Sequence, residues 1–201
     1  VNLESERSNN IDFSLDYEND GYFLSASVYS NSVDDYIYLE DSKKTQDKLP
    51  ILNFTQADAD FNGYEIEVGK SFAFNNGEFQ ISYGRDEVVG TFSSGGNVPR
   101  ITPIKNVYSF SYAQENIMYD LKIKDVQKED DLGLNETVTD GYTMVDFDIT
   151  RNIAIGNGEE LVLSVFGSNL LDEKARSHTS YAKGPVPMAG RNFGVKLNFN
   201  F

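Results

Sequence analysis

The sequence has no cysteine and no tryptophan, only one histidine, and no long apolar run. Without cysteine the chain forms neither a disulfide nor a thiolate metal site, and cysteine-based catalysis is excluded. No stretch approaches the roughly 18 apolar residues of a membrane-spanning helix. The lack of an apolar run does not exclude membrane-spanning strands, because a strand that alternates apolar and polar residues crosses a membrane while remaining polar on average.

Basic residues are scarce too. The chain has 17 lysine and arginine residues against 32 aspartate and glutamate residues, which gives a formal charge of -15. So acidic a chain repels phosphate, and nucleic acid is not expected as a partner. High charge with few aromatics is typical of disorder, but this chain has 14 phenylalanines and 12 tyrosines. We therefore expect a folded chain in which the aromatic side chains occupy particular positions.

Apolar residues recur at every second position. At the C-terminus the alternating apolar residues are Phe193, Val195, Leu197, Phe199 and Phe201. Successive strand side chains point to opposite faces, so such a run has one apolar and one polar face. Similar alternation occurs at 11–18, 22–28, 64–69, 79–83, 108–112, 117–123 and 145–150, and less cleanly at 161–171. No stretch has helical spacing, so the chain is predicted to be all-β, with about nine long strands.

The predicted connections alternate between two kinds. Tight turns, rich in Asn, Asp and Gly, are expected at 19–21, 75–77, 115–116 and 156–158. Longer polar loops are expected at 39–53, 86–98, 127–141 and 174–190. This is an antiparallel up-and-down meander with a smooth end and a loop-bearing end, typical of a transmembrane β-barrel. Counted back from the last strand, the first strand starts at the loop end, which predicts the C-terminal part of a larger barrel.

The same alternation has an alternative interpretation. A soluble or surface-exposed β-sheet binding module, such as an adhesin or a carbohydrate binder, would bury its aromatic faces against each other. Sandwich strands are shorter, however, and their Greek-key links break a strict alternation of short and long connections. A chain that stays monomeric without detergent would favour the module.

Several segments resemble TonB-dependent outer-membrane receptors. They include VFGSNLLD at 165–172, GRNF at 190–193 and the terminal Phe201. Earlier segments, TQADADFNGYE at 55–65, PRITP at 99–103 and NET to DGY at 135–142, are most similar to the zinc-uptake branch of that family. The resemblance implies a barrel of about 22 strands in the bacterial cell outer membrane, closed by a plug. It also implies uptake of a metal ion or metal chelate, of the zinc or iron–siderophore type.

On this resemblance, residues 1–201 are the C-terminal strands of the barrel, and the plug and earlier strands lie outside the sequence. The implied partners are outer-membrane lipid, the plug domain of the same full-length chain, TonB through the missing N-terminal part, and the barrel-assembly machinery. That machinery would read an assembly signal made of Phe193, Val195, Leu197, Phe199 and Phe201.

One group of residues suggests a metal site. His178 lies in the loop predicted at 174–190, and Asp172 and Glu173 come just before it. Imidazole and carboxylates suit zinc, and a loop can lend ligands to a site that other segments complete. The alternative is an exposed loop without a site role, since the spacing matches no self-contained metal motif. No resident cofactor is expected, and zinc or another metal is considered as cargo.

Carboxylates also fall on the polar face of the predicted strands, at Asp12, Asp16, Glu65, Glu67, Asp146 and Asp148. In a barrel this face is the lumen, where they would contact basic plug residues or attract cations, or would simply be solvated. Enzymatic activity is not expected. Ser177, His178 and Ser180 are neighbours in one loop and do not readily form a catalytic triad.

Overall fold

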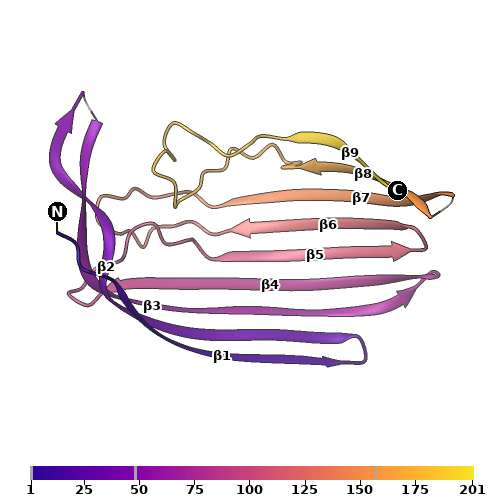
Figure 1. Ribbon diagram of the computed structural model, residues 1–201, viewed down its shortest axis with the longest axis horizontal. Coiled ribbons are helices and arrows are strands. Elements are labelled where there is room, and N and C mark those ends of the chain that lie inside the picture. Colours follow the sequence, from indigo (N-terminus) through magenta and orange to yellow (C-terminus); the bar gives the residue numbers. More distant parts are fainter. Residues whose placement is uncertain (1, 48, 157) are drawn as a thin grey trace.

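The computed structural model describes residues 2–47, 49–156 and 158–201, and it forms one antiparallel sheet in which each strand pairs with the next (Figure 1). The strands are β1 (Arg7–Asn19), β2 (Tyr22–Gln46), β3 (Leu49–Phe74), β4 (Gly77–Phe92), β5 (Lys105–Gln114), β6 (Ile117–Val126), β7 (Tyr142–Gly156), β8 (Glu159–Ser168) and β9 (Asn192–Asn200). The predicted all-β meander is therefore confirmed. No helix among these residues is long and apolar enough to span a membrane, a result that says nothing about a β-barrel.

Tight turns gather at one end of the sheet and long connections at the other (Figure 1). Asp20, Asn75 and Glu115 take φ values of 50°, 47° and 50° in three of the turns. In the fourth turn, between β7 and β8, Asn157 lies outside the described residues. Loops 93–104, 127–141 and 169–191 lie at the other end, with the N-terminus, whereas the C-terminus lies at the tight-turn end (Figure 1).

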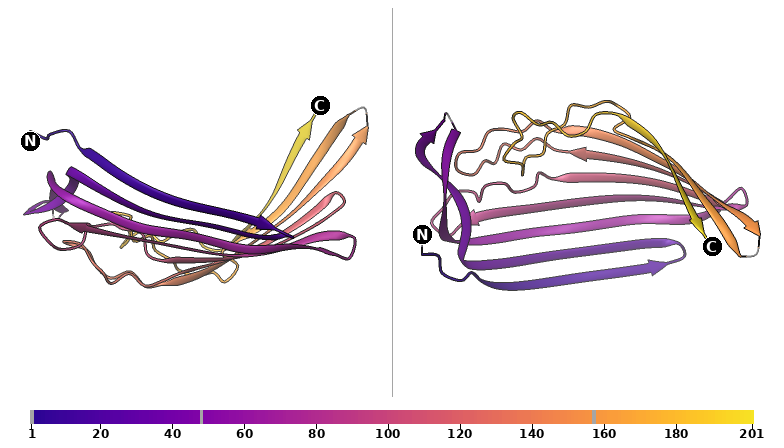
Figure 2. Two further views of the ribbon diagram at one scale, coloured as in Figure 1. Left: turned by 90° about the horizontal axis from the view of Figure 1, so that it is seen from below. Right: turned by 45° about the horizontal axis from the view of Figure 1, so that its top comes forward.

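The register carries apolar side chains across one face of the sheet. One continuous row of directly paired residues consists of Tyr17, Leu24, Val68, Tyr83, Tyr108, Ile123 and Val145. On this apolar face Ile11 and Phe13 are 71% and 69% exposed. The sheet is bent and twisted rather than flat (Figure 2). Its large apolar surface thus has no cover within the described part of the chain.

The β2–β3 hairpin is longer than expected. A loop was predicted at 39–53, but β2 and β3 are 25 and 26 residues long and stay paired as far as Gln46 and Leu49. Likewise β4 continues to Phe92, into the loop predicted at 86–98. The β2–β3 register shifts between Val33 and Tyr36 and again between Asp41 and Thr45. Each bulge inserts unpaired residues and disturbs the period-two pattern, so the sequence did not indicate a strand here.

We call residues 35–58 the arm. Beyond Asp34, β2 no longer pairs with β1, and β4 pairs with β3 only as far as Ala59. The arm is therefore a two-stranded ribbon that leaves the sheet at the loop end and bends across that end, towards the side of β7 (Figure 1). Its tip contacts loop 127–141, where Lys43 Nζ donates to Asn135 Oδ1 at 3.0 Å.

Aromatic rings cover glycines of neighbouring strands. Phe23 is paired with Gly69, Tyr29 with Gly63 and Phe166 with Gly194, all on the polar face. A ring laid over a glycine restores packing that the missing side chain would supply. The pairing accounts for Phe166, which interrupts the alternation of the 161–171 segment.

Both edges of the sheet are open. Within the described residues, β1 pairs only with β2 and β9 only with β8, and all 13 residues of β1 are exposed. Edge strands present unpaired N–H and C=O groups, which lipid does not tolerate. The sheet as described is one part of a structure that must continue beyond these edges if it lies in a membrane.

Candidate functional site

Three long loops meet at a buried polar cluster, which we call the loop junction: Arg100 of loop 93–104, Glu136 and Thr139 of loop 127–141, and His178 and Lys183 of loop 169–191. At its centre, His178 Nε2 lies 3.2 Å from Glu136 Oε1, and the two side chains are only 1% and 4% exposed. On the other side of the ring, Nδ1 lies 2.8 Å from Thr139 Oγ1. Both imidazole nitrogens are therefore occupied within the chain.

The donors and acceptors of the junction are satisfied in the following assignment of hydrogens. Lys183 Nζ donates to Thr139 Oγ1 at 2.8 Å, the Thr139 hydroxyl donates to Nδ1 of His178, and Nε2–H donates to Glu136. The Glu136 carboxylate also accepts from the backbone amides of Arg100 and Gly133, at 3.0 and 2.9 Å. No buried side-chain nitrogen or oxygen of the described residues lacks a partner. The junction is a complete polar network that links all three loops.

Burial changes the acidity of two groups beside the ring. It lowers the pKa of the Lys183 ammonium, against the attraction of Glu136. It raises the pKa of the Glu129 carboxyl, against hydrogen bonding to the Asp131 amide and the nearby His178. Glu129 is held there by backbone hydrogen bonds with Thr139 of 2.9 and 3.0 Å. Both charged forms are disfavoured by desolvation.

The three predicted metal ligands do not come together. Asp172 contacts Arg191, whose amide donates to Asp172 Oδ1 at 3.0 Å and whose guanidinium Nη2 lies 3.6 Å from Oδ2. The Glu173 amide donates to the Asn169 side chain. His178 contacts Glu136 instead. In the described residues no three or more His, Cys, Asp or Glu side chains are placed to hold a metal ion.

The residue that sequence reasoning missed is Glu136. It lies on another loop, and no periodicity or spacing relates it to His178. Its position within the 135–142 segment, quoted for the family resemblance, was the only signal in the sequence that pointed to it.

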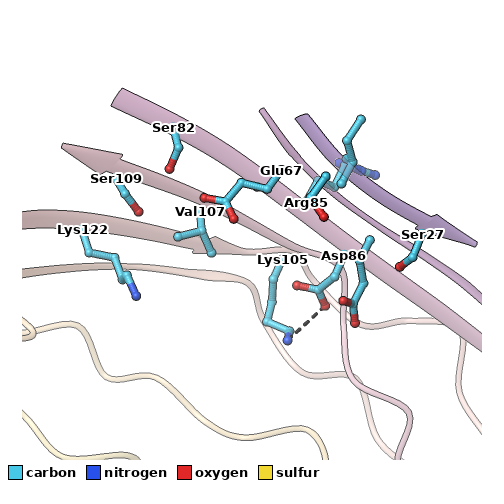
Figure 3. A pocket seen from close by; sticks show the side chains of 13 residues that line it. Ser27, Glu67, Ser82, Arg85, Asp86, Lys105, Val107, Ser109 and Lys122 are labelled. Atoms are coloured by element: carbon cyan, nitrogen blue, oxygen red, sulfur yellow. Dashed lines mark ion pairs between the residues drawn. The ribbon is translucent and has the colours of Figure 1, made fainter. Parts of the chain in front are cut away.

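The polar face carries a hollow of about 450 Å³ between β2 and β6 (Figure 3). Glu65, Glu67 and Asp86 line one side, with Lys105 and Lys122 on the other. Lys105 Nζ lies 3.0 Å from Asp86 Oδ2 (Figure 3, dashed line). Opposite charges on adjacent strands thus partly neutralise each other here.

The other predicted carboxylates have local partners. Asp146 Oδ1 accepts the Asn169 amide at 2.7 Å, which fixes the start of loop 169–191. Asp148 Oδ1 accepts the Thr150 hydroxyl at 2.6 Å. Asp12 accepts the Asn10 side-chain amide, and Asp16 lies opposite Ser25 in the β1–β2 pairing.

A charged group also lies on the apolar face, near the loop end. Arg85 Nε donates to Tyr64 Oη at 2.7 Å, and Nη1 donates to Asn106 Oδ1 at 3.1 Å. Arg85 Nη2 lies 3.4 Å from Glu87 Oε2, which also accepts the Tyr64 hydroxyl. This network pairs a cation with an anion where every row nearer the tight turns is mainly apolar.

The family model described as "TonB dependent receptor-like, beta-barrel" matches residues 1–170. The chain belongs to this family. Solved structures share the fold of this TonB-dependent receptor barrel. The copper transporter OprC is 20% identical with a TM-score of 0.82, over all of this chain and 32% of that one. The ferric-catecholate import receptor Fiu from E. coli K12 is 15% identical with a TM-score of 0.61, over 97% of this chain and 27% of that one.

A further solved relative is the FrpB iron transporter of Neisseria meningitidis, 14% identical with a TM-score of 0.63, over 96% of this chain and 30% of that one. This chain therefore spans about a third or less of each of these proteins. At such low identities the likeness shows the fold alone. The family match ends at residue 170, so most of loop 169–191 and all of β9 lie beyond it.

In this TonB-dependent receptor strand array, β9 carries four of the five C-terminal residues singled out from the sequence, and Phe201 follows it. Four of them pair directly with β8: Phe193 with Gly167, Val195 with Val165, Leu197 with Leu163 and Phe199 with Leu161. Phe193 is 67% exposed, and Phe201, just past the strand, is 97% exposed. They form an apolar stripe along an edge of the sheet.

Proposed function

We propose that residues 1–201 form the C-terminal strands of a TonB-dependent transporter that takes up a metal ion or metal chelate across the bacterial outer membrane. The observation that carries the proposal is the apolar face, which no other described residues cover, while both edges of the described sheet are unpaired. Lipid would cover the apolar face, and earlier strands of the same chain would pair with the two edges. Metal cargo is supported by the names of similar structures, a copper transporter, a ferric-catecholate import receptor and an iron transporter.

In this proposal the tight turns face the periplasm and the long loops face the outside. The plug domain of the full-length chain fills the lumen against the polar face, and TonB acts on the plug from the periplasm. The carboxylates of Glu65 and Glu67 suit contacts with basic plug residues. The chain contributes wall and loops, and no enzymatic step belongs to this function.

Zinc is the cargo we propose first, from the resemblance of the 55–65, 99–103 and 135–142 segments. His178, Asp172 and Glu173 would then supply loop ligands to the metal. Both nitrogens of His178 are occupied in the loop junction, so such binding requires the ring to leave Glu136 or Thr139.

We also propose that Phe193, Val195, Leu197, Phe199 and Phe201 are the signal that the barrel-assembly machinery recognises. Their shared exposed face on an edge strand supports this role, because an open edge is available for pairing.

The test uses the full-length protein. It should fractionate with the outer membrane, need detergent for extraction, and migrate differently on gels before and after heating. A strain that lacks the gene should grow poorly when zinc is limiting and recover when the gene is restored. If restoring the gene improved growth when iron chelates or copper were limiting, but not when zinc was, the cargo would be iron or copper rather than zinc. A protein that is monomeric without detergent would contradict the transporter and favour a soluble β-sheet module.

A further inference from the structure

The loop junction connects segments that are otherwise independent. Loops 93–104, 127–141 and 169–191 leave from different strand pairs, so the backbone links them only through the sheet. Above the sheet, the link runs from Arg100 and Gly133 through the Glu136 carboxylate to His178. One carboxylate therefore holds groups from all three loops.

Further contacts join the same loops. Asn97 and Gly133 form a β-bridge, and a Cβ on Gly133 would lie 2.5 Å from Pro99 Cα, so these two loops are in close backbone contact. The Arg100 guanidinium lies 3.4 Å from the centroid of the Tyr181 ring, which joins loop 93–104 to loop 169–191. The arm is joined through Lys43 and Asn135.

Fully buried apolar side chains are few in this assembly. The buried apolar residues of the loops are Val98 and Ala175, whereas Leu134, Val138, Tyr181 and Val186 are 47–59% exposed. A small hollow of about 100 Å³, lined by Pro103, Val126 and His178 among others, separates the junction from the strand ends. The loops are thus held mainly by directional polar contacts, which form or break together when one partner is lost.

We infer that the loop junction fastens loops 93–104, 127–141 and 169–191 into one lid over the loop end, held by the contact between His178 and Glu136, so that all three loops loosen together when this contact is lost. The lid goes beyond the transport role, because its existence does not depend on which cargo the protein carries.

Amide hydrogen exchange on the full-length protein tests the inference. His178→Ala changes loop 169–191, but it should speed exchange at least tenfold at the Arg100 and Thr139 amides, which belong to the other two loops. Amides of β4 and β5 should stay protected, which shows that the barrel remains folded. Arg191→Gln is the matched control, because Arg191 is in the same loop but pairs with Asp172 outside the junction. Faster exchange confined to loop 169–191 in the His178 variant would overturn the lid.

A second experiment uses the absence of cysteine from this chain. Cysteines replacing Glu136 and His178, in a full-length protein free of other reactive thiols, can be joined by a short bis-maleimide, because the tips of the two original side chains meet. Before linkage, exchange at the Thr139 amide of loop 127–141 and in loop 169–191 should be fast, and after linkage it should return toward the wild-type rate. The Arg100 amide is not a probe in this variant, because its acceptor is the replaced Glu136 carboxylate.

Exchange also separates the lid from the proposed transport. Linkage that leaves exchange fast in loop 127–141 would overturn the lid. A wild-type protein that takes up no zinc, yet shows the expected exchange, would contradict the proposed cargo and leave the lid standing.

Discussion

The Phe166 ring lies directly across Gly194 of the neighbouring strand, so that a Cβ built on this glycine would come within 2.3 Å of Phe166 Cζ. The contact ties the last strand of the sheet to β8 on the polar face. It is made by a ring that breaks the alternation of its own strand.

Gly194→Ala should therefore destabilise the barrel, by about 1–2 kcal/mol, because the ring must swing away from the sheet. The temperature at which the folded gel band of the full-length protein disappears measures the effect. Gly184→Ala is the control, since a Cβ at Gly184 meets nothing within 4 Å. Equal melting of the two variants would show that Phe166 moves without cost.

The ion pair on the apolar face gives a second prediction. Glu87→Leu removes the carboxylate beside Arg85 and leaves a cation on a surface that we propose faces lipid. We expect a loss of about 1–2 kcal/mol, measured by denaturant unfolding of the full-length protein in lipid vesicles. The double variant R85L/E87L should recover most of that loss. A double variant less stable than the single one would mean that the pair itself is net stabilising.

The third prediction concerns pH. Because burial raises the pKa of Glu129, the closed loop binds more protons than the open loop between the ordinary glutamate pKa and the raised value. Closure should weaken as pH rises through this window. The protection of the Thr139 amide, corrected for intrinsic exchange, measures closure, since this amide donates to the Glu129 carbonyl at 3.0 Å.

Glu129→Gln removes that titration. In the variant, protection should be nearly flat across the window and, at neutral pH, higher than in the wild type. Lys183 does not interfere, because its pKa is lowered from a much higher ordinary value. Protection that rises with pH in the wild type would contradict the assigned direction.

Removal of Phe201 separates assembly from stability. Its side chain is 97% exposed and its described ring contact is with Phe199, at 5.8 Å between centroids. We expect much less protein in the outer membrane, about tenfold less, but an unchanged melting temperature for the fraction that inserts, since little folded-state packing is lost. Lys196→Gln, on the other face of β9, is the control. Normal membrane levels of the shortened protein would contradict the assembly signal.

The alternation of apolar and polar residues in the sequence was enough to predict the strands and their order. Each apolar residue of a half-exposed strand shares a face with the residues two positions away. This prediction failed in the arm, where bulges at Asp35 and Lys43 place residues at φ values of 57° and 59° and disturb the alternation. The polar partners of Arg85 were also not predicted, since they come from three strands.

The candidate site was predicted only in part. His178 was correctly placed in a long loop, but its contacts depend on how that loop folds against another, and a single sequence holds no periodic signal for loop packing. Asp172 and Glu173 were chosen as neighbours in the chain. In the structure Asp172 instead pairs with Arg191 and fixes the opening of β9.

The arm joins the sheet through a bulge at its base, between Val33 and Tyr36. β2 and β3 otherwise pass from the sheet into the ribbon as continuous strands, and among the described residues their pairing shifts once more, between Asp41 and Thr45. A molecule that pulls on the tip therefore pulls on the wall, and through Lys43 and Asn135 on the neighbouring loop as well. The arm is thus a continuation of two strands of the sheet that is tied in addition to a loop between two other strands.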